Sequence, residues 1–431
     1  MAHQTIRPLR VIAAKELRET LRDGRFRWLA ASLLILLAAG LVAGAFETRA
    51  ARAAIALAEA EERSTWLGQG PRNPHSAAHF GSYAFKPRPV LSALDRGVDA
   101  YLGTAVWLEA HWQDPFALRP AEDRTAVQRF GELTAAFTLQ VLVPLLIIVL
   151  GFGTFAGERE RGTLRQLASL GVDAHTLALG KAFGLGAALA LVLLPAGLLT
   201  LAFAVAGGSG IVATLVMVVV YALYFAIWLG LVLAVSAWAS TARTALVVLL
   251  GFWMLQALIV PRLVADAAEQ VIPVPTAGEF FAIIAEHEAQ GMHGAGDRAA
   301  RRQALEAEVM AEYGVDSLSE LPVNFAGISL QASEEHSNLV YDAAYGDLWQ
   351  RYLGQEQLHM WGAALSPRLA VRAVSMAVAG TDVARHRHFA EAAEQHRRAL
   401  VKFLNDDMTQ NAGTDGFGYL ADEALWRAAP T

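Results

Sequence analysis

Five long apolar runs, none with a charged side chain at its centre, limit the fold more than any other feature of the chain. They cover residues 28–46, 135–156, 182–206, 211–238 and 245–260. A helix rises about 1.5 Å per residue, so about 20 apolar residues cross the hydrocarbon core of a bilayer. A single run could be a buried helix of a soluble protein, but five predict a polytopic membrane protein. The composition agrees, because 55% of the 431 residues are hydrophobic and only 18% are charged.

Basic residues gather in three segments outside these runs, and they predict the orientation of the chain. All three segments fall on one side of the membrane if the five spans alternate in direction, and short basic segments favour the cytoplasmic side. Residues 47–134 and 262–431, more than half of the chain, then lie on the extracytoplasmic side. The basic residues are Arg7, Arg10, Lys15, Arg18, Arg22, Arg25 and Arg27, then Arg159, Arg161, Arg165 and Lys181, and finally Arg243.

The first 27 residues have the pattern of an amphipathic helix. Basic side chains, among them Lys15, Arg18 and Arg22, surround an apolar stripe. Such a helix is expected to lie in the headgroup layer on the cytoplasmic side. The alternative is that these charges only flank the first span. The stripe consists of Val11, Ile12, Ala13, Leu17 and Leu21.

A polar hairpin at residues 157–176 separates the second and third apolar runs. Thr163 is a residue type that starts helices, and Gln166 follows three positions later, which is the spacing of a capping box. Gly171 is a natural C-terminal stop. The hairpin is therefore predicted to hold a short capped helix along the membrane surface. Its apolar stripe consists of Leu164, Leu167, Ala168 and Leu170.

The sequence patterns of the two polar segments predict mainly helices. Residues 50–62 are alanine-rich and extend the first span outward, whereas proline and glycine predict coil at 68–89. No alternating strand pattern is visible. We expect a mainly all-α membrane protein with five to six spans and a large, mostly helical extracytoplasmic domain. Helical periodicity recurs near 279–290, 297–313, 333–361 and 382–405, and one face of the last stretch carries Phe389, Ala393, His396, Leu400 and Phe403.

The predicted layout follows from these patterns. Each apolar run is a span, and the polar segments between them alternate sides. The layout is a cytoplasmic connecting helix at 1–27, spans at 28–46, 135–156, 177–206, 211–238 and 245–261, a cytoplasmic hairpin at 157–176, and inserts at 47–134 and 262–431.

A few small and polar residues inside the spans suggest contacts between helices. Gln140 and Gln256 are expected to form hydrogen bonds from one helix to another. Three glycine pairs have the GxxxG spacing that lets helix backbones approach closely, a pattern that is weak in spans this rich in glycine and alanine. The pairs are Gly40 with Gly44, Gly153 with Gly157, and Gly180 with Gly184.

Motifs for catalysis are absent from the sequence. It has no GxxxxGK[ST] phosphate loop, no HExxH and no GxSxG, and the absence of cysteine excludes disulfides and thiolate metal sites. His75 and His79 are four residues apart, a spacing that on a helix could hold a metal ion. Because proline and glycine predict coil there, we expect hydrogen-bonding histidines and no metal site. Other histidines in the two polar segments are His111, His386, His388 and His396.

The exit from the second span resembles a known family. It reads Phe155-Ala156-Gly157-Glu158-Arg159-Glu160-Arg161-Gly162-Thr163-Leu164 and continues Leu167-Ala168-Ser169-Leu170-Gly171. With the basic amphipathic start, it closely resembles the membrane subunits (permeases) of ABC-2 type, type V exporter-like ABC transporters. Residues 73–79, 106–111, 365–367 and 379–382 resemble a subgroup with large extracytoplasmic inserts of unknown function. The likeness spans nearly the whole chain.

This resemblance implies a role for the hairpin and a set of partners. The hairpin would be a coupling helix that docks on a separate ATPase, and charges at 158–161 would pair with that partner. Two ATPase subunits would supply ATP and Mg²⁺, a second identical or related permease would pair with this chain, and the complex would sit in a bacterial inner membrane. Lipid and an extracytoplasmic protein are further expected partners; nucleic acid and a cofactor in this chain are not. The coupling residues would be Glu158, Arg159, Glu160, Arg161, Gly162, Thr163, Leu164, Gln166 and Leu167.

One departure concerns the sixth span that such subunits usually have. Residues 365–379 are the only candidate, and Arg368 and Arg372 interrupt them. Inserting a helix with an arginine at its centre into a membrane costs about 2.5–3.5 kcal/mol. The stretch up to Trp426 and Thr431 contains no further apolar run. We expect the last helix to be missing from this chain, the alternative being a five-span member.

Two classes of function fit these patterns. The first is a non-catalytic permease subunit that couples ATP hydrolysis by a separate subunit either to export or to mechanical signalling to an outer partner. The second is a membrane-anchored scaffold or sensor whose outer domain binds a protein without transport. An enzyme ranks last, because no catalytic constellation stands out.

Overall fold

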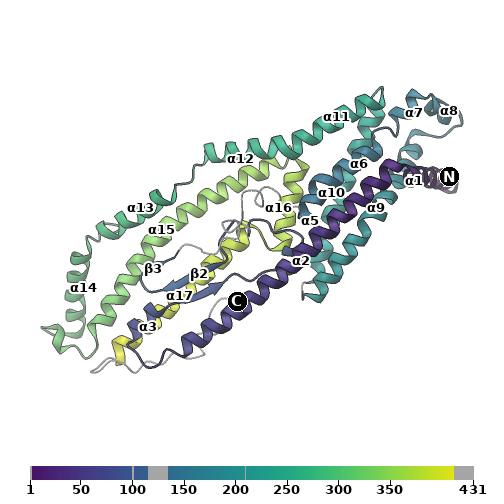
Figure 1. Cartoon of the computed structure of the whole chain (residues 1–431). Coiled ribbons are helices and arrows are strands. Elements are labelled where there is room, and N and C mark those ends of the chain that lie inside the picture. Colours follow the sequence, from purple (N-terminus) through teal and green to yellow (C-terminus); the bar gives the residue numbers. More distant parts are fainter. Residues whose placement is uncertain (1, 100, 115–133, 209, 412–431) are drawn as a thin grey trace.

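The computed structural model describes residues 2–99, 101–114, 134–208 and 210–411, and the molecule is long and thin (Figure 1). A bundle of apolar helices forms one part, and a helical domain with a small sheet forms the other. Short helices cap the bundle at the end away from this domain. We call that end the hairpin end.

Five helical segments among the described residues are long and apolar enough to cross a membrane, as predicted. The fourth, α10, has the predicted bounds. The first, α2, has 44 residues and measures about 66 Å, so it continues beyond the bundle along the helical domain, as the alanine-rich stretch indicated. The spans are α2 (Gly24–Leu67), α5 to α7 (Ala135–Glu160), α9 (Ala174–Ala206), α10 (Ile211–Trp238) and α11 to α12 (Ala242–Val271).

Two of these spans contain a π-helical turn that includes a glutamine. The turn η2 (Thr138–Leu142) holds Gln140 between α5 (Ala135–Phe137) and α6 (Val143–Gly151). The turn η3 (Leu255–Ile259) holds Gln256 between α11 (Ala242–Met254) and α12 (Val260–Val271). A proline follows within the next two residues in each case, and π-helical turns are frequent at functional sites.

The glutamines form the predicted bonds between helices. Gln140 Nε2 donates to Tyr221 of α10 at 3.0 Å, and Gln256 accepts from Ser366 at 3.4 Å. A backbone carbonyl of η2 also accepts a hydrogen bond from another span. The indole of Trp253 donates to Val141 O at 3.0 Å.

The predicted sixth-span candidate is a short helix that packs against the bundle. Helix α16 (Pro367–Ala379) has 13 residues, too few to cross a bilayer, and contacts α10 and both π-turns. Its Arg368 guanidinium donates to the carbonyl of Ala257 in η3. Residues 412–431, which the sequence predicts to hold no further span, lie outside the described residues.

The helical domain confirms the four predicted helical stretches. They correspond to α13 (Ala277–Gln290), α14 (Arg298–Tyr313), α15 (Phe325–Gly362) and α17 (Val383–Asn411). A capping box of Thr276 and Glu279 starts α13. The short turn η4 (Leu318–Glu320) joins α14 to α15.

The predicted inner face of α17 is only partly correct. Phe389, Ala393 and Leu400 are buried, but Phe403 is 44% exposed. The helix instead turns the charged Arg397 inward, and its guanidinium is satisfied by Glu394, Asn338 and Glu334.

The expectation of coil at 68–89 is only partly correct, because a helix and a strand occupy most of residues 74–85. The segment folds into α3 (Pro74–Phe80), which Asn73 caps, followed by β1 (Ser82–Phe85), and η1 (Val90–Ala93) comes after it. Strand β1 pairs antiparallel with β2 (Ala105–Glu109), which pairs with β3 (Trp112–Gln113). The alternation was invisible because small Ser82 and Ala84 point inward while Tyr83 points outward.

Candidate functional site

The hairpin between the second and third spans consists of two short helices at a sharp bend. Helix α7 (Ala156–Glu160) continues the second span, and α8 (Thr163–Ser169) follows Gly162, whose φ of 76° is a left-handed conformation that favours glycine. The predicted capping box is absent. Thr163 lies inside α8, and its hydroxyl donates to the Glu158 carbonyl at 3.2 Å. Gly171, with φ of 77°, ends the turn as predicted.

The predicted apolar stripe of α8 divides between two faces. Leu164 and Leu167 are half-buried against Phe155 and Leu177, so they hold α8 onto the bundle. Ala168 and Leu170 face outward, against the prediction, and Leu170 is 77% exposed. Leu170 is an apolar side chain that α8 leaves free to contact a partner protein. Helices α7 and α8 lie at the tip of the molecule at the hairpin end (Figure 1).

The charges expected to meet a partner also divide. Glu160, Arg161 and Arg165 are exposed, as is the amide of Gln166. Arg159 is exposed, but its guanidinium is hydrogen-bonded. It donates to Ala237 O at 2.6 Å, in the last turn of α10, and to the carbonyl of Ala239, which follows that helix. Glu158 differs from the prediction that it contacts a partner protein, because it is 6% exposed and its side chain points into the protein.

Glu158 belongs to a buried ion cluster that joins three helices. The ammonium of Lys181, on α9, lies 2.8 Å from Oε1 of Glu158 and 2.8 Å from Oε1 of Glu16, on α1 (Ala2–Arg22). Lys181 is 1% exposed. At the rim, Lys15 lies 3.6 Å from Glu158, and the carboxylates of Glu16, Glu19 and Glu158 outweigh its partial burial and raise its pKa. Two ammonium groups therefore balance the two buried carboxylates.

Helix α1 packs on α9 through two glycines. A Cβ at Gly180 would lie 2.6 Å from Ile12, and one at Gly184 would lie 2.6 Å from the Cβ of Glu16. The GxxxG pair is therefore a close-packing face for α1. The predicted helix at the N-terminus is confirmed, and Arg18 and Arg22 are exposed on it. Its buried face is shifted from the predicted stripe, since Val11 is 64% exposed.

The other glycine pairs differ. Gly44 meets the backbone of Ala93 in η1, where a Cβ would clash, whereas a Cβ at Gly153 would meet open space. Gly180 and Gly184 act together on one neighbouring helix, α1.

The cluster of Glu16, Glu158 and Lys181 was not predicted from the sequence. Lys181 was counted among the basic residues that set the orientation, and Glu16 was not singled out. A signal exists in the sequence, because Lys181 lies between Gly180 and Gly184 at the start of an apolar run. A charge on a close-packing glycine face must have a partner on the helix that packs there.

Helix α10 connects the hairpin end to the helical domain. At the hairpin end, the buried Ser236 hydroxyl donates to Phe152 O at 2.8 Å and accepts from Phe155 N at 3.0 Å. Close to the middle of α10, the Tyr221 hydroxyl lies 3.1 Å from Ser375 of α16, and Ser375 donates to Asp95 at 2.5 Å. Burial raises the pKa of Asp95.

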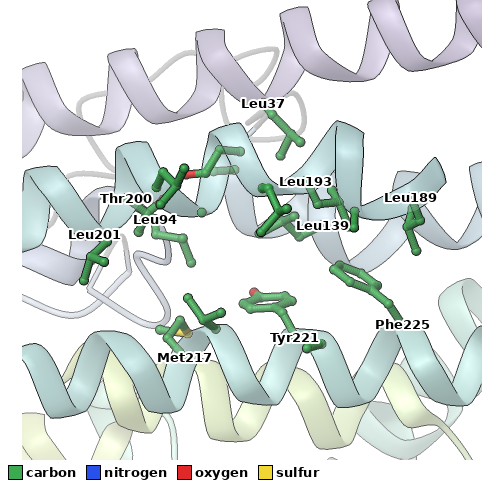
Figure 2. A pocket seen from close by; sticks show the side chains of 18 of the residues that line it. Leu37, Leu94, Leu139, Leu189, Leu193, Thr200, Leu201, Met217, Tyr221 and Phe225 are labelled. Atoms are coloured by element: carbon green, nitrogen blue, oxygen red, sulfur yellow. The ribbon is translucent and has the colours of Figure 1, made fainter. Parts of the chain in front are cut away.

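An apolar cavity of about 430 Å³ lies between α2, α9 and α10. Figure 2 shows Tyr221 and Phe225 of α10 pointing into it, opposite Leu139 and Leu193. Thr200 and Tyr221 supply the hydroxyl groups of a lining that is otherwise almost wholly aliphatic and aromatic.

The histidines considered for metal binding lie in the helical domain. His75 and His79 are on α3, so the prediction that they sit in coil is wrong, and His111 lies in the turn between β2 and β3. His386 and His388 are on α17, the first buried and the second exposed.

Within the described residues, five apolar helical segments, a hairpin held by a buried ion cluster and a large helical domain define a mostly helical polytopic membrane protein. Residues 10–295 match the family model described as ABC-2 family transporter protein, and the chain belongs to this family. It is therefore a membrane subunit of an ABC transporter, a class that works with an ABC ATPase. Residues 281–431 match a domain of unknown function, DUF3526. No curated protein matches the chain.

Proposed function

We propose that this permease receives the energy of ATP hydrolysis from a separate ABC ATPase through α8 and α1 and passes it as movement to the helical domain. In this proposal the hairpin end is cytoplasmic and the helical domain extracytoplasmic, in a bacterial inner membrane. A second identical or related permease and two ATPase subunits complete the complex, and ATP and Mg²⁺ bind to the ATPase.

The observation that carries the proposal is the double attachment of α10. Ser236 ties this helix to the bend before α7, and Tyr221 ties it to Ser375 of α16. A helix of 28 residues is about 42 Å long and moves largely as a unit. A tilt imposed on the hairpin therefore shifts α16, which packs on α15 of the helical domain. ATP biases the populations of two such arrangements.

A second candidate function, export, is favoured by the cavity of Figure 2. Its lining suits an apolar molecule that enters from the membrane. Export and signalling share the same docking surface and differ in what the outer part does. The scaffold alternative lacks the docking surface, so the first experiment separates it from both.

The docking surface is tested with two exposed residues, Arg165 of α8 and Leu170, which directly follows α8. Arg165→Glu and Leu170→Asp are expected to reduce co-purification with the ABC ATPase, and the ATPase rate of the complex, about tenfold or more. Arg165→Glu reverses an exposed charge, which weakens association mainly by slowing the encounter of the two proteins. Leu170→Asp would bury a carboxylate in the interface, and its desolvation costs binding free energy. The matched control is Arg298→Glu, an exposed arginine on α14. Normal coupling in both α8 variants would refute docking through α8.

Orientation and movement are tested with introduced cysteines, because the chain has none of its own. Ser169→Cys is expected to react with a membrane-impermeant maleimide only from the cytoplasmic side, and Arg298→Cys only from the other side. A spin label at position 298 and a second at 67, near the end of α2, should change separation when the complex binds ATP. A constant separation in a complex that still transports would favour export without signalling.

A further inference from the structure

Three histidines converge at the surface of the helical domain. His75 and His79 extend from successive turns of α3, and His111 approaches from the turn between β2 and β3. Their ring centroids are 4.7, 5.1 and 5.1 Å apart, and one nitrogen of each ring lies within 4.8 Å of the others. Nitrogens that bind one tetrahedral ion at about 2.0–2.1 Å are about 3.3 Å apart. Small rotations of the rings would therefore bring all three into coordination.

His111 is oriented by a buried carboxylate. Glu334 of α15 is 2% exposed. Its carboxylate accepts a hydrogen bond from Nδ1 of the His111 ring at 2.5 Å and another from the His111 backbone N–H at 2.6 Å. Arg397 lies 3.3 Å from the other oxygen of Glu334. A carboxylate that holds one ring nitrogen and leaves the other for the ion is the usual support of a metal-binding histidine.

His111 also has a strained backbone. Its φ of 66° is a left-handed conformation that a residue with a Cβ rarely adopts. Such strain persists where the surroundings impose it and is concentrated at functional sites. Here the bond from the His111 N–H to Glu334 holds the turn in place, and the ring is thereby directed at α3.

His75 supplies an independent sign of a missing partner. Its Nδ1 is buried and makes no hydrogen bond. A buried polar atom of this kind costs stability unless a partner satisfies it.

We propose that His75, His79 and His111 bind one divalent transition metal ion of the zinc type. Imidazole suits zinc, copper and nickel, and three histidines with an open fourth position form a known zinc geometry. His79 is exposed, so the open position faces solvent and can take water or a ligand atom from another molecule. The site is independent of the proposed coupling to an ATPase.

The ion would join parts of the chain that are far apart in sequence. It would bridge α3 to the turn after β2, and Glu334 and Arg397 extend that link to α15 and α17. The regions matched by the two family models therefore meet at this site. The metal would fix the packing of the domain around the end of α2, where Trp66 lies in the core beside α3.

The test uses the full chain in detergent, stripped with a chelator and titrated with Zn²⁺. We expect one equivalent to bind and to raise the unfolding temperature. His79→Ala should reduce the affinity at least a hundredfold while leaving the metal-free fold intact, because His79 is exposed. His388→Ala, which removes an exposed histidine of α17, is the matched control and should bind as the unaltered chain does.

Glu334→Gln provides a second measurement. It should weaken Zn²⁺ binding about 10–100-fold, the usual effect of removing such a support. The proposal is wrong if the unaltered chain binds less than one equivalent, or if His79→Ala binds Zn²⁺ as tightly as the His388→Ala control. Neither result depends on an ATPase, so failure here leaves the proposed coupling untouched.

Discussion

The ammonium of Lys181 lies 2.8 Å from Glu158 and joins the last turn of the second span to the third. The same ammonium reaches Glu16, so one buried cation fixes α1, α7 and α9 together. The exposed face of α8 is thus presented by a rigid base. Movement of α8 relative to the bundle must either carry α1 and α9 with it or break this contact.

Lys181→Met should therefore destabilise the protein strongly. It leaves Glu16 and Glu158 buried with only Lys15 nearby, and removal of one member of a buried pair typically costs about 3–5 kcal/mol. Lys15→Met should cost about 1 kcal/mol or less, because the Lys15 side chain is 50% exposed. Thermal unfolding of both variants in detergent measures the difference. Equal unfolding temperatures would mean that the cluster is solvated and carries little structural weight.

Ser236→Ala should loosen the bend before α7. The Phe155 N–H loses its acceptor and the Phe152 carbonyl its donor, and a buried unsatisfied group costs about 1–3 kcal/mol. We expect a lower unfolding temperature and weaker stimulation of ATP hydrolysis in the complex. Ser319→Ala is the control, because that exposed hydroxyl on η4 of the helical domain bonds to Ser317 and lies outside the proposed docking surface. Identical ATPase rates in the two variants would contradict transmission through α10.

Much of the fold could be predicted from the sequence, because apolar length and helical periodicity are local signals. The bounds of α10 and the helices α13, α14 and α17 follow from them. The sheet could not be predicted, since strands of two to five residues with inward Ser82 and Ala84 lack the alternation that marks a strand. The π-turns depend on bonds to α10 and α16 and have no local signature.

The candidate site was predictable only in part. The glycines of the hairpin indicated a bend, and its polar composition indicated a helix at the surface. The inward turn of Glu158 depends on Lys181 and Glu16, which are far from it in sequence. Likewise, the approach of His111 to α3 depends on the pairing of β1 with β2 and on Glu334, so spacing alone could not reveal it.

Tyr221→Phe should uncouple the helical domain from the bundle. The phenol accepts from Gln140 and contacts Ser375, so its loss leaves the buried Gln140 amide without this partner. We expect a loss of about 1–3 kcal/mol in stability and a smaller ATP-dependent change between labels at 67 and 298. Tyr313→Phe, on the exposed side of α14, is the control. An unchanged label response would assign the transmission to another contact.

Acid should destabilise the helical domain through His386. Burial and the charge of Lys86 lower its pKa to about 4, whereas the unfolded chain has the ordinary value of 6.5. Between these values the unfolded state binds the proton, so stability is complete above pH 6.5 and falls towards pH 4, by at most about 3 kcal/mol. His386→Gln should reduce this slope, and His388→Gln, at an exposed position, should not. Parallel slopes in all three proteins, measured by unfolding temperature against pH, would contradict this assignment.

Gly184→Ala should displace α1 from the bundle. The added Cβ would lie 2.6 Å from the Cβ of Glu16 and 2.7 Å from the carbonyl of Ala13, and backbone cannot yield as a flexible side chain can. Overpacking of this kind costs about 1–3 kcal/mol. Gly186→Ala is the matched control on the same helix, because its Cβ would meet only Leu229 at an ordinary 3.8 Å, and alanine is the better helix former. We expect Gly184→Ala alone to lower the unfolding temperature and expose α1 to protease. If α1 stays protected, its contact with α9 tolerates a shift, and the rigid base inferred for α8 does not exist.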